Sequence, residues 1–223
     1  MRSNRTYYKK LEEKNKKPVR PSRERADPFN GHEELLTDVV FILGNGKSRQ
    51  IFNLERLRGL GTIIGCNAIY RDFEPDILVV IDAKMIEEVD KSGYAKDHRV
   101  LLPANRQRSI KEAMIWRTVG FNTAGCFSMK LVTEIMVPKC CYMLGMDGYP
   151  GNVYDGTENY SPNTLQNFDG VIRYYNTVLS VDAPTIFYNV NKKDTWDASS
   201  PRYNFITYKE FEQHIKDGFY LED

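Results

Sequence analysis

The segment VVFILGNGKS, residues 39–48, decides the fold class of this chain. Its five leading apolar residues predict a strand that is buried on both faces, and such strands occur in parallel sheets covered by helices on both sides. Gly44-Asn45-Gly46 predicts a tight turn directly after the strand. Beyond the turn, apolar residues recur every third position, which we interpret as an amphipathic helix through Ile51, Leu54, Leu57 and Leu60.

Apolar runs of the same kind recur along the chain and predict further strands at residues 62–67, 76–82, 99–102 and 140–147. A run at 185–190 is expected to be the last strand, and residues 196–204 a polar connection. Helical spacing is found at 124–136, 168–179 and 208–219, and the stretch 149–163 has the composition of a loop. This order predicts an α/β, Rossmann-like, doubly wound and mostly parallel sheet.

The formal net charge of +1 hides an uneven distribution. Residues 1–25 contain ten Lys and Arg against three Glu, a net charge of +7, and the remaining residues contain 21 against 27, or −6. Residues 1–34 also contain almost no large aliphatic residues, which predicts a basic, flexible N-terminal arm followed by one nucleotide-binding domain at 35–223. Such an arm suits a polyanion, for example a nucleic acid.

The four cysteines lie inside apolar runs without metal-ligand spacing, so we expect buried, reduced thiols. No apolar run reaches the roughly 18 residues of a membrane span, and we expect a soluble, cytoplasmic protein.

The glycine turn suits a phosphate, because a glycine backbone lets N–H groups approach it and a following helix favours negative charge. The two best-known phosphate motifs fail here. Arg49 stands where the dinucleotide fingerprint has its third glycine, and Phe41 where an ATPase P-loop has its first. A tight turn without any ligand stays open as the alternative.

Polar residues follow the predicted strands at their carboxyl ends: Asn45, Asn67, Asp82 and Asp147, with Thr123 before a helix. The carboxyl ends of parallel strands meet at one edge of a sheet, so these side chains are expected to converge on one crevice. Each of them alone also fits a helix cap or a turn.

These stretches resemble two related groups of proteins. Residues 41–48, 65–71 and 75–82 are similar to the start of the small bacterial sialyltransferases, which use a CMP-sugar donor, and of the 6-hydroxymethylpterin diphosphokinase-like (MptE-like) domains. The likeness to the sialyltransferases continues at 122–125 and at 144–149, where they carry a Thr-Ser-Gly turn and a Ser-Gly-Ile-Asp-Phe-Tyr strand end. It covers roughly residues 38–190.

The resemblance implies a nucleotide-dependent transferase, a glycosyltransferase with a nucleotide-sugar donor in the first place. It implies nucleotide contacts from Gly44, Asn45, Gly46, Lys47, Ser48, Asn67, Thr123, Ala124 and Gly125. Lys47 replaces the usual proline and is interpreted either as a phosphate contact or as a solvated lysine. Asp147 and Tyr149 are the expected catalytic residues, and the loop tyrosines Tyr149, Tyr154 and Tyr160 the expected lid.

One departure concerns the catalytic base. The sialyltransferases carry a histidine after the Asp-x-Tyr strand, whereas this chain offers only Tyr160, Ser161, Asn163 and Asp169 there. Asp169 is interpreted either as the base or as an ordinary surface residue of a helix. Two alternatives therefore stay open. One is a Mg²⁺-dependent pyrophosphoryl transferase like the pterin diphosphokinases, with Asp82 or Asp147 as a metal ligand. The other is a non-catalytic protein that binds nucleotide or nucleic acid.

Overall fold

The computed structural model describes residues 28–106, 109–161 and 167–220. These residues form one eight-stranded sheet in the order β5-β4-β3-β2-β1-β6-β7-β8, and every pair of neighbouring strands is parallel. The strands are β1 (Val39–Leu43), β2 (Thr62–Cys66), β3 (Ile77–Val79), β4 (Val100–Pro103), β5 (Met114–Trp116), β6 (Cys140–Leu144), β7 (Ile186–Val190) and β8 (Tyr203–Ile206). The predicted α/β, doubly wound parallel sheet is confirmed.

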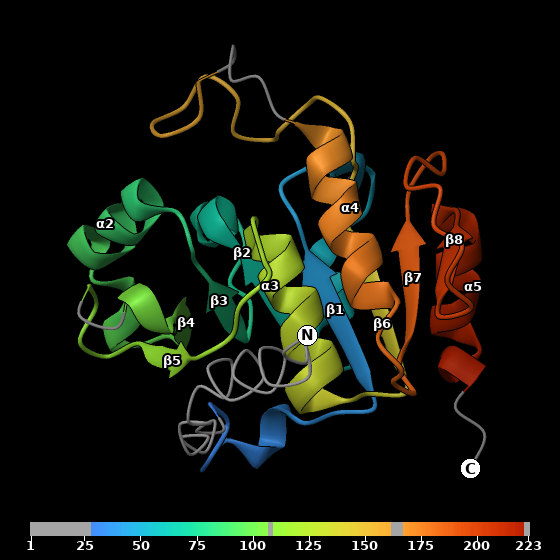
Figure 1. Cartoon of the computed structure of the whole chain (residues 1–223), viewed down its shortest axis with the longest axis horizontal. Helices are drawn as coiled ribbons and strands as arrows, with labels where there is room; N and C mark the ends of the chain where they lie inside the picture. The colour runs from blue at the N-terminus through green and yellow to red at the C-terminus, as the bar shows by residue number, and fades with distance from the viewer. Residues whose placement is uncertain (1–27, 107–108, 162–166, 221–223) are drawn as a thin grey trace, which may run out of the picture.

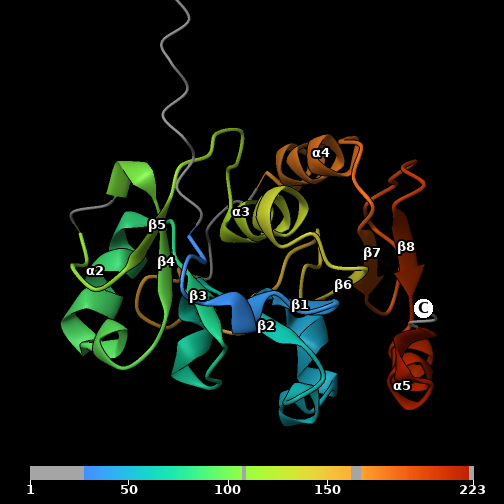
Figure 2. The ribbon, with the colours of Figure 1, turned by 90° about the horizontal axis from the view of Figure 1, so that it is seen from below.

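The helices cover both faces of the sheet, as Figures 1 and 2 show. On one face lie α3 (Ala124–Leu131), which continues as the π-helical turn Val132–Met136, and α4 (Phe168–Leu179). On the other lie α2 (Ala83–Ser92), α5 (Tyr208–Lys216) and the short 3₁₀ helices η2 (Lys47–Ile51) and η3 (Leu54–Leu57). The order is therefore helix, sheet, helix, as the buried strands require.

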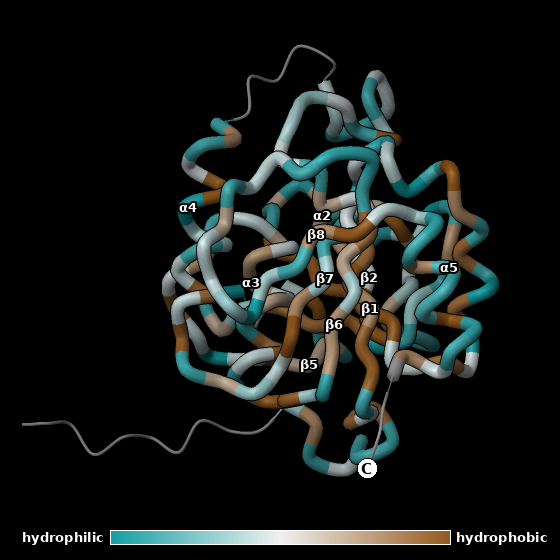
Figure 3. Tube along the Cα trace, turned by 90° about the vertical axis from the view of Figure 1, so that its right-hand side faces the viewer, coloured by the Kyte–Doolittle hydropathy of each residue, from teal (hydrophilic) through white to brown (hydrophobic). Residues whose placement is uncertain are grey.

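Strand β1 shows how the two cores are divided between the faces. All five of its residues are buried, and they point alternately to opposite sides of the sheet. Phe41 packs in the cluster that contains Leu57 and Phe211, and Ile42 in the cluster that contains Phe127 and Leu179. Figure 3 shows the hydrophobic stretches of β1 and β6 running through the interior of the molecule.

The prediction of one amphipathic α-helix after the glycine turn is wrong. Two 3₁₀ helices replace it, because Phe52 is extended and the side chain of Asn53 accepts the backbone N–H of Glu55 (3.1 Å), which starts a new helix. The three-residue apolar spacing matches the three residues per turn of a 3₁₀ helix better than the 3.6 of an α-helix. Leu54 and Leu57 are buried, whereas Ile51 is exposed.

Two further expectations are corrected at the ends of the domain. Residues 185–190 are not the last strand, because β8 follows them and pairs with β7. The predicted arm extends to residue 34, but Phe29 is 1% exposed and packs in the cluster under α3, held in a turn whose His32 N–H donates to the Phe29 carbonyl (2.7 Å). Residues 1–27 of the arm lie outside the described residues.

The cysteines are buried and free, as predicted. Among the described residues, no helix is long and apolar enough to cross a membrane.

Candidate functional site

The sheet changes its direction of winding between β1 and β6. From β1 the chain adds β2 to β5 on one side, then returns to pair β6 with the other side of β1 and continues to β7 and β8. The loops after β1 and β6 consequently leave the sheet on opposite sides, and the crevice between them is where open α/β sheets bind ligands. A cavity of about 1090 Å³ lies at this point.

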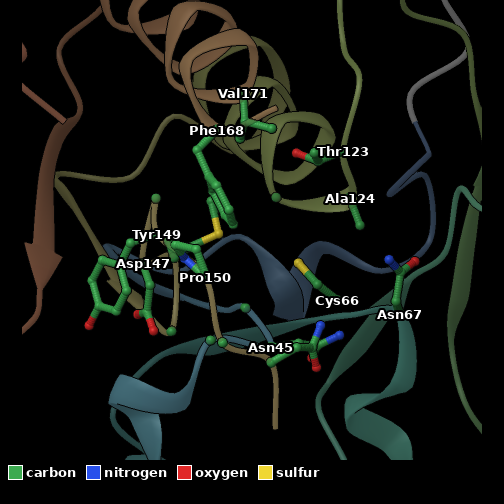
Figure 4. Close-up of a pocket in the computed structure, with 18 of the residues that line it drawn as sticks. Asn45, Cys66, Asn67, Thr123, Ala124, Asp147, Tyr149, Pro150, Phe168 and Val171 are labelled. Atoms are coloured by element: carbon green, nitrogen blue, oxygen red, sulfur yellow. The ribbon is translucent and has the colours of Figure 1, made fainter. Parts of the chain in front are cut away.

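The cavity is lined by strand ends, two helix starts and one loop. Figure 4 shows Asn45 and Asn67 on one side, Asp147 and Tyr149 on another, and Phe168 and Val171 of α4 opposite Asn45. A ligand pocket for a small molecule measures about 300–1000 Å³, so this cavity has room for a nucleotide with an attached group. Of the predicted site residues, Gly44, Asn45, Gly46, Asn67, Asp82, Thr123, Ala124, Gly125, Asp147 and Tyr149 line it.

Three predicted site residues are not part of the lining. The Lys47 ammonium lies 3.4 Å from the Asp155 carboxylate, and its methylene stem lies against Gly151. Ser48 is buried and hydrogen-bonds Asp147. Asp169 is exposed on the first turn of α4, as an ordinary surface residue of a helix would be.

The glycine turn is shaped by the neighbouring turn after β6. A Cβ atom on Gly44 would lie 2.3 Å from the Gly145 carbonyl oxygen, and one on Gly46 would lie 2.4 Å from the Asp147 carboxylate. The Gly46 N–H also donates to the Gly145 carbonyl (2.8 Å). These glycines allow two turns of the protein to touch. The helix that follows is a 3₁₀ helix of five residues, too short to supply the helix terminus that a phosphate was expected to use.

A helix terminus does reach the cavity from α3. Thr123 is the N-cap of this helix, and its hydroxyl accepts the N–H of Cys126 (3.1 Å). Ala124 and Gly125, which line the cavity, occupy the first turn, where backbone N–H groups have no partner within the helix. Gly125 lies close to Met146, and a Cβ there would meet the Met146 methyl at 2.5 Å.

Asp147 is held by three hydrogen bonds. One carboxylate oxygen accepts from the Ser48 hydroxyl and from the Asn191 amide (3.3 Å), and the other accepts from the Ser48 backbone N–H (3.0 Å). The side chain is buried, and this burial raises the pKa of Asp147 against the opposing effect of the hydrogen bonds. Asp147 thus ties the turns after β1 and β6 to the end of β7 and has little capacity left for a ligand.

Asn45 and Asn67 present unsatisfied acceptors. The Asn45 amide nitrogen donates to the Tyr160 hydroxyl (3.3 Å) and the Asn67 amide nitrogen to the Asp82 carboxylate (2.8 Å). The side-chain oxygen of each is buried without a hydrogen-bond partner. Asn67 has a φ of 51°, a left-handed conformation that asparagine tolerates better than most residues. Buried polar atoms are normally paired, so both oxygens indicate a place for a ligand.

Asp82 is the exposed carboxylate among the predicted residues that line the cavity. Its side chain is exposed, yet the surrounding walls desolvate it enough to raise its pKa, while the Asn67 hydrogen bond and the charge of Arg106 lower it. In the described part of the chain, no group of three or more His, Cys, Asp or Glu side chains is placed so that it could hold a metal ion. A Mg²⁺ ion of the pyrophosphoryl alternative would be held by Asp82 together with substrate phosphates, and that alternative stays a prediction.

The loop after β6 forms one wall and is fastened at several points. Tyr154 was expected in a lid, but it is buried and its hydroxyl bonds the Asp72 carboxylate and Arg49. Arg71 lies 2.5 Å from Glu88 and also donates to the Glu158 carbonyl (3.0 Å), and Asn159 donates to Glu88 (2.7 Å). Among the described loop residues, Tyr154 is therefore an anchor rather than a moving lid.

The Glu88→Gln variant tests this anchoring. A glutamine cannot bond Arg71 through two charged contacts, so the free energy that holds the loop should fall by about 1–2 kcal/mol. We expect hydrogen exchange of the loop amides at 151–160 to accelerate about tenfold, and the exchange of β1 to stay unchanged. Glu87→Gln, which breaks only an exposed pair with Lys91, is the matched control. Equal exchange in both variants would contradict the anchoring.

No histidine of the described chain lines the cavity. His32 is in the first turn, His98 stacks on Tyr94, and His214 lies on α5 beside Tyr142. The cavity instead contains residues that the sequence did not single out: Asn122, Asn152, Asp155, Asn159, Asn167, Phe168 and Tyr175. Three of them, Asn152, Asp155 and Asn159, lie in the stretch 149–163 that the sequence predicts simply as a loop, and its richness in Asn and Tyr was the available signal.

Comparison with known proteins found two similar solved structures. The first is the sialyltransferase CST-II in complex with a trisaccharide acceptor and CMP, with a TM-score of 0.49 and 13% identity over 75% of this chain and 89% of that chain. The second is a mutant of the alpha-2,3/8-sialyltransferase CstII, with a TM-score of 0.43 and 13% identity over 75% and 90%. No family model matches the sequence, and no curated protein matches it.

Proposed function

We propose that the protein is a nucleotide-dependent glycosyltransferase that binds a nucleotide-sugar in the cavity between β1 and β6. The observation that carries the proposal is the meeting, in one cavity of about 1090 Å³, of a helix N-terminus with two buried, unpartnered amide oxygens. The first turn of α3 supplies N–H donors and a positive dipole end for phosphate. The amide oxygens of Asn45 and Asn67 accept hydrogen bonds from ribose or base. The sequence resemblance described above supports sugar transfer.

In the proposed reaction, an acceptor hydroxyl attacks the anomeric carbon, the bond from that carbon to the phosphate oxygen breaks, and the hydroxyl proton passes to a base. Asp82 suits this role, because it opens to the cavity and its raised pKa brings it nearer to the working pH. The Asp147 carboxylate accepts hydrogen bonds from Ser48 and Asn191. We therefore assign Asp147 the role of holding in place the turns after β1 and β6, which form part of the cavity wall. Tyr149 donates to Asn191 (3.1 Å) and borders the same cavity.

Nucleotide binding is the direct test. Calorimetric titration with CMP, CDP, UDP and ATP, with and without Mg²⁺, should show binding of at least one nucleotide. The Asn45→Ala variant should bind that nucleotide about tenfold more weakly, the effect of losing one hydrogen bond to a buried acceptor. Asn204→Ala, at an exposed position of β8, is the control and should bind as the parent does. If none of these nucleotides binds, the proposal is wrong.

Binding without catalysis is the second candidate. The specific observation in its favour is the engaged carboxylate of Asp147 in a described cavity that lacks a histidine. The two candidates differ in one measurement. An enzyme slowly hydrolyses its donor when no acceptor is present, and Asp82→Asn should reduce that rate, whereas a binding protein returns the donor intact.

A further inference from the structure

Aromatic rings line the cavity, and most of them already lie against another group of the protein. The aromatic residues of the lining are Tyr149, Tyr160, Phe168 and Tyr175. The Lys193 ammonium lies 5.0 Å from the centre of the Tyr149 ring. The ring centres of Tyr154 and Tyr160 are 5.7 Å apart, and those of Tyr175 and Trp196 are 4.5 Å apart. Phe168 differs, because among the residues that the structure describes no ring stacks on it and no cation lies over it.

Phe168 also stands apart from the hydrophobic core. It is half-buried and belongs to neither of the two core clusters. Figure 4 shows its side chain projecting from α4 into the cavity. The position of the ring is fixed from below, since Asn167 caps the helix and its side chain accepts the Gly170 N–H (2.9 Å). The ring therefore offers apolar surface to a ligand rather than to the core.

The face of α4 that carries Phe168 leads to the N-terminus of α3. Phe168, Val171 and Tyr175 follow the spacing i, i+3, i+7, so they share one face of α4, and all three line the cavity. A Cβ on Gly125 in the first turn of α3 would lie 3.1 Å from the Tyr175 hydroxyl oxygen. Seven residues of helix rise about 10 Å. Phe168 consequently lies about two helical turns from the proposed phosphate site, a span that one nucleotide bridges between its phosphate and its base.

The wall between these two points is apolar. Cys66, Met146 and Val171 line it, and their side chains offer at most sulfur atoms, which are weak hydrogen-bonding groups. Ribose or sugar hydroxyl groups placed there would lose their hydrogen bonds to water without replacement. The flat faces of a nucleobase need no hydrogen bonds, and they stack on aromatic rings. The base is therefore the part of a nucleotide that suits this wall.

From these observations we infer that the base of the bound nucleotide stacks on Phe168 while its phosphate lies at the N-terminus of α3. The inference rests on the proposed function, since it assigns the base subsite of that same cavity. Every base has a flat face, so stacking on Phe168 supplies affinity for nucleotides in general and does not select one base over another.

Binding of a nucleotide and of its base-free part by the Phe168→Ala variant tests the inference. Calorimetry compares the nucleotide that binds best with ribose 5-phosphate. We expect Phe168→Ala to bind the nucleotide about tenfold more weakly, the usual effect of removing one stacking ring, and to bind ribose 5-phosphate as the parent does. Tyr174→Ala is the control, because it removes an exposed ring of the same helix that does not line the cavity. An unchanged nucleotide affinity in Phe168→Ala overturns the inference and leaves the proposed function standing.

NMR spectra of the nucleotide separate stacking from a general effect on the shape of the site. A proton that lies over an aromatic ring shifts upfield, so the base protons should shift upfield on binding to the parent. Phe168→Leu keeps an apolar side chain of similar size and should bind the nucleotide without that shift. The same upfield shift in Phe168→Leu would mean that another ring holds the base, and the inference would be wrong. If no nucleotide binds to the parent, the proposed function fails and the inference falls with it.

Discussion

The Gly44→Ala variant is expected to unfold at a temperature about 6–12 °C below the parent, the shift that a loss of roughly 3 kcal/mol causes in a domain of this size. The added methyl group would lie 2.3 Å from the Gly145 carbonyl oxygen and 2.8 Å from its carbon. Both are backbone atoms, so no side chain can turn aside. Gly44 and Gly145 follow two paired central strands, so relief requires that β1 and β6 separate at their carboxyl ends.

Gly59→Ala is the control for this experiment. Gly59 has a φ of 75° and open space around its position, so its substitution carries only the cost of the left-handed conformation, about 1 kcal/mol. Thermal unfolding followed by circular dichroism should rank parent, Gly59→Ala and Gly44→Ala in decreasing stability. If Gly44→Ala melts together with Gly59→Ala, the contact between the two turns is not as close as described. Nucleotide binding should weaken in Gly44→Ala, because the same turn lines the cavity.

The central strands were predictable because their burial is complete. Residues 39–43 and 140–144 are apolar at every position, and a strand with two buried faces cannot be amphipathic. Strand β8 was missed for the opposite reason. It is a short edge strand in which Asn204 is exposed between the buried Tyr203 and the half-buried Phe205, and its first two residues fall within the predicted polar connection 196–204.

The helix after the glycine turn shows a limit of periodicity. A spacing of three is compatible with both helix types, and the choice was made by Asn53, whose side chain competes for a backbone N–H. The sequence carries this cue, but a single capping residue weighs little against four apolar positions. The consequence for function is large. The η2 helix is too short to supply the helix N-terminus that was expected to bind phosphate, so the N-terminus of α3 is the one that can bind it.

The strand-end residues of the cavity were predictable from topology alone. Once a parallel sheet was expected, Asn45, Asn67, Asp82 and Asp147 had to lie at one edge. Which way each side chain turns was not predictable, because it depends on partners far away in the sequence. Ser48 faces Asp147, which is 99 residues away, and Lys47 faces Asp155. The residues of the long loop were missed because irregular structure has no period that assigns side chains to a face.

The Asp147→Ala variant is expected to lose about 3 kcal/mol of unfolding free energy and all measurable nucleotide binding, because it leaves buried donors without partners. The Ser48 N–H, the Ser48 hydroxyl and the Asn191 amide all donate to this carboxylate. The void also removes the contact that positions Gly46 against the turn after β6. Denaturant unfolding at pH 7 measures the loss, with Asp90→Ala on the exposed face of α2 as the control.

The pH dependence separates burial of the charge from loss of the hydrogen bonds. Folding raises the pKa of Asp147 above its ordinary value near 3.8, chiefly because the carboxylate is desolvated. The native state therefore holds this proton more tightly than the unfolded state does. The resulting contribution to stability is complete below pH 3.8 and is lost as the pH rises through the folded pKa.

An Asp147→Asn variant cannot titrate at this position, so its stability relative to the parent should improve as the pH rises from about 4 to 7. The Asp90→Asn variant, at an exposed position of α2, is the control and should show no such improvement. A difference between parent and Asp147→Asn that stays constant with pH would mean that the hydrogen bonds offset the desolvation of the carboxylate, so that folding does not raise the pKa of Asp147. A difference that grows in favour of the parent would mean that the three hydrogen bonds outweigh burial, and that Asp147 is ionised as a stabilising clamp.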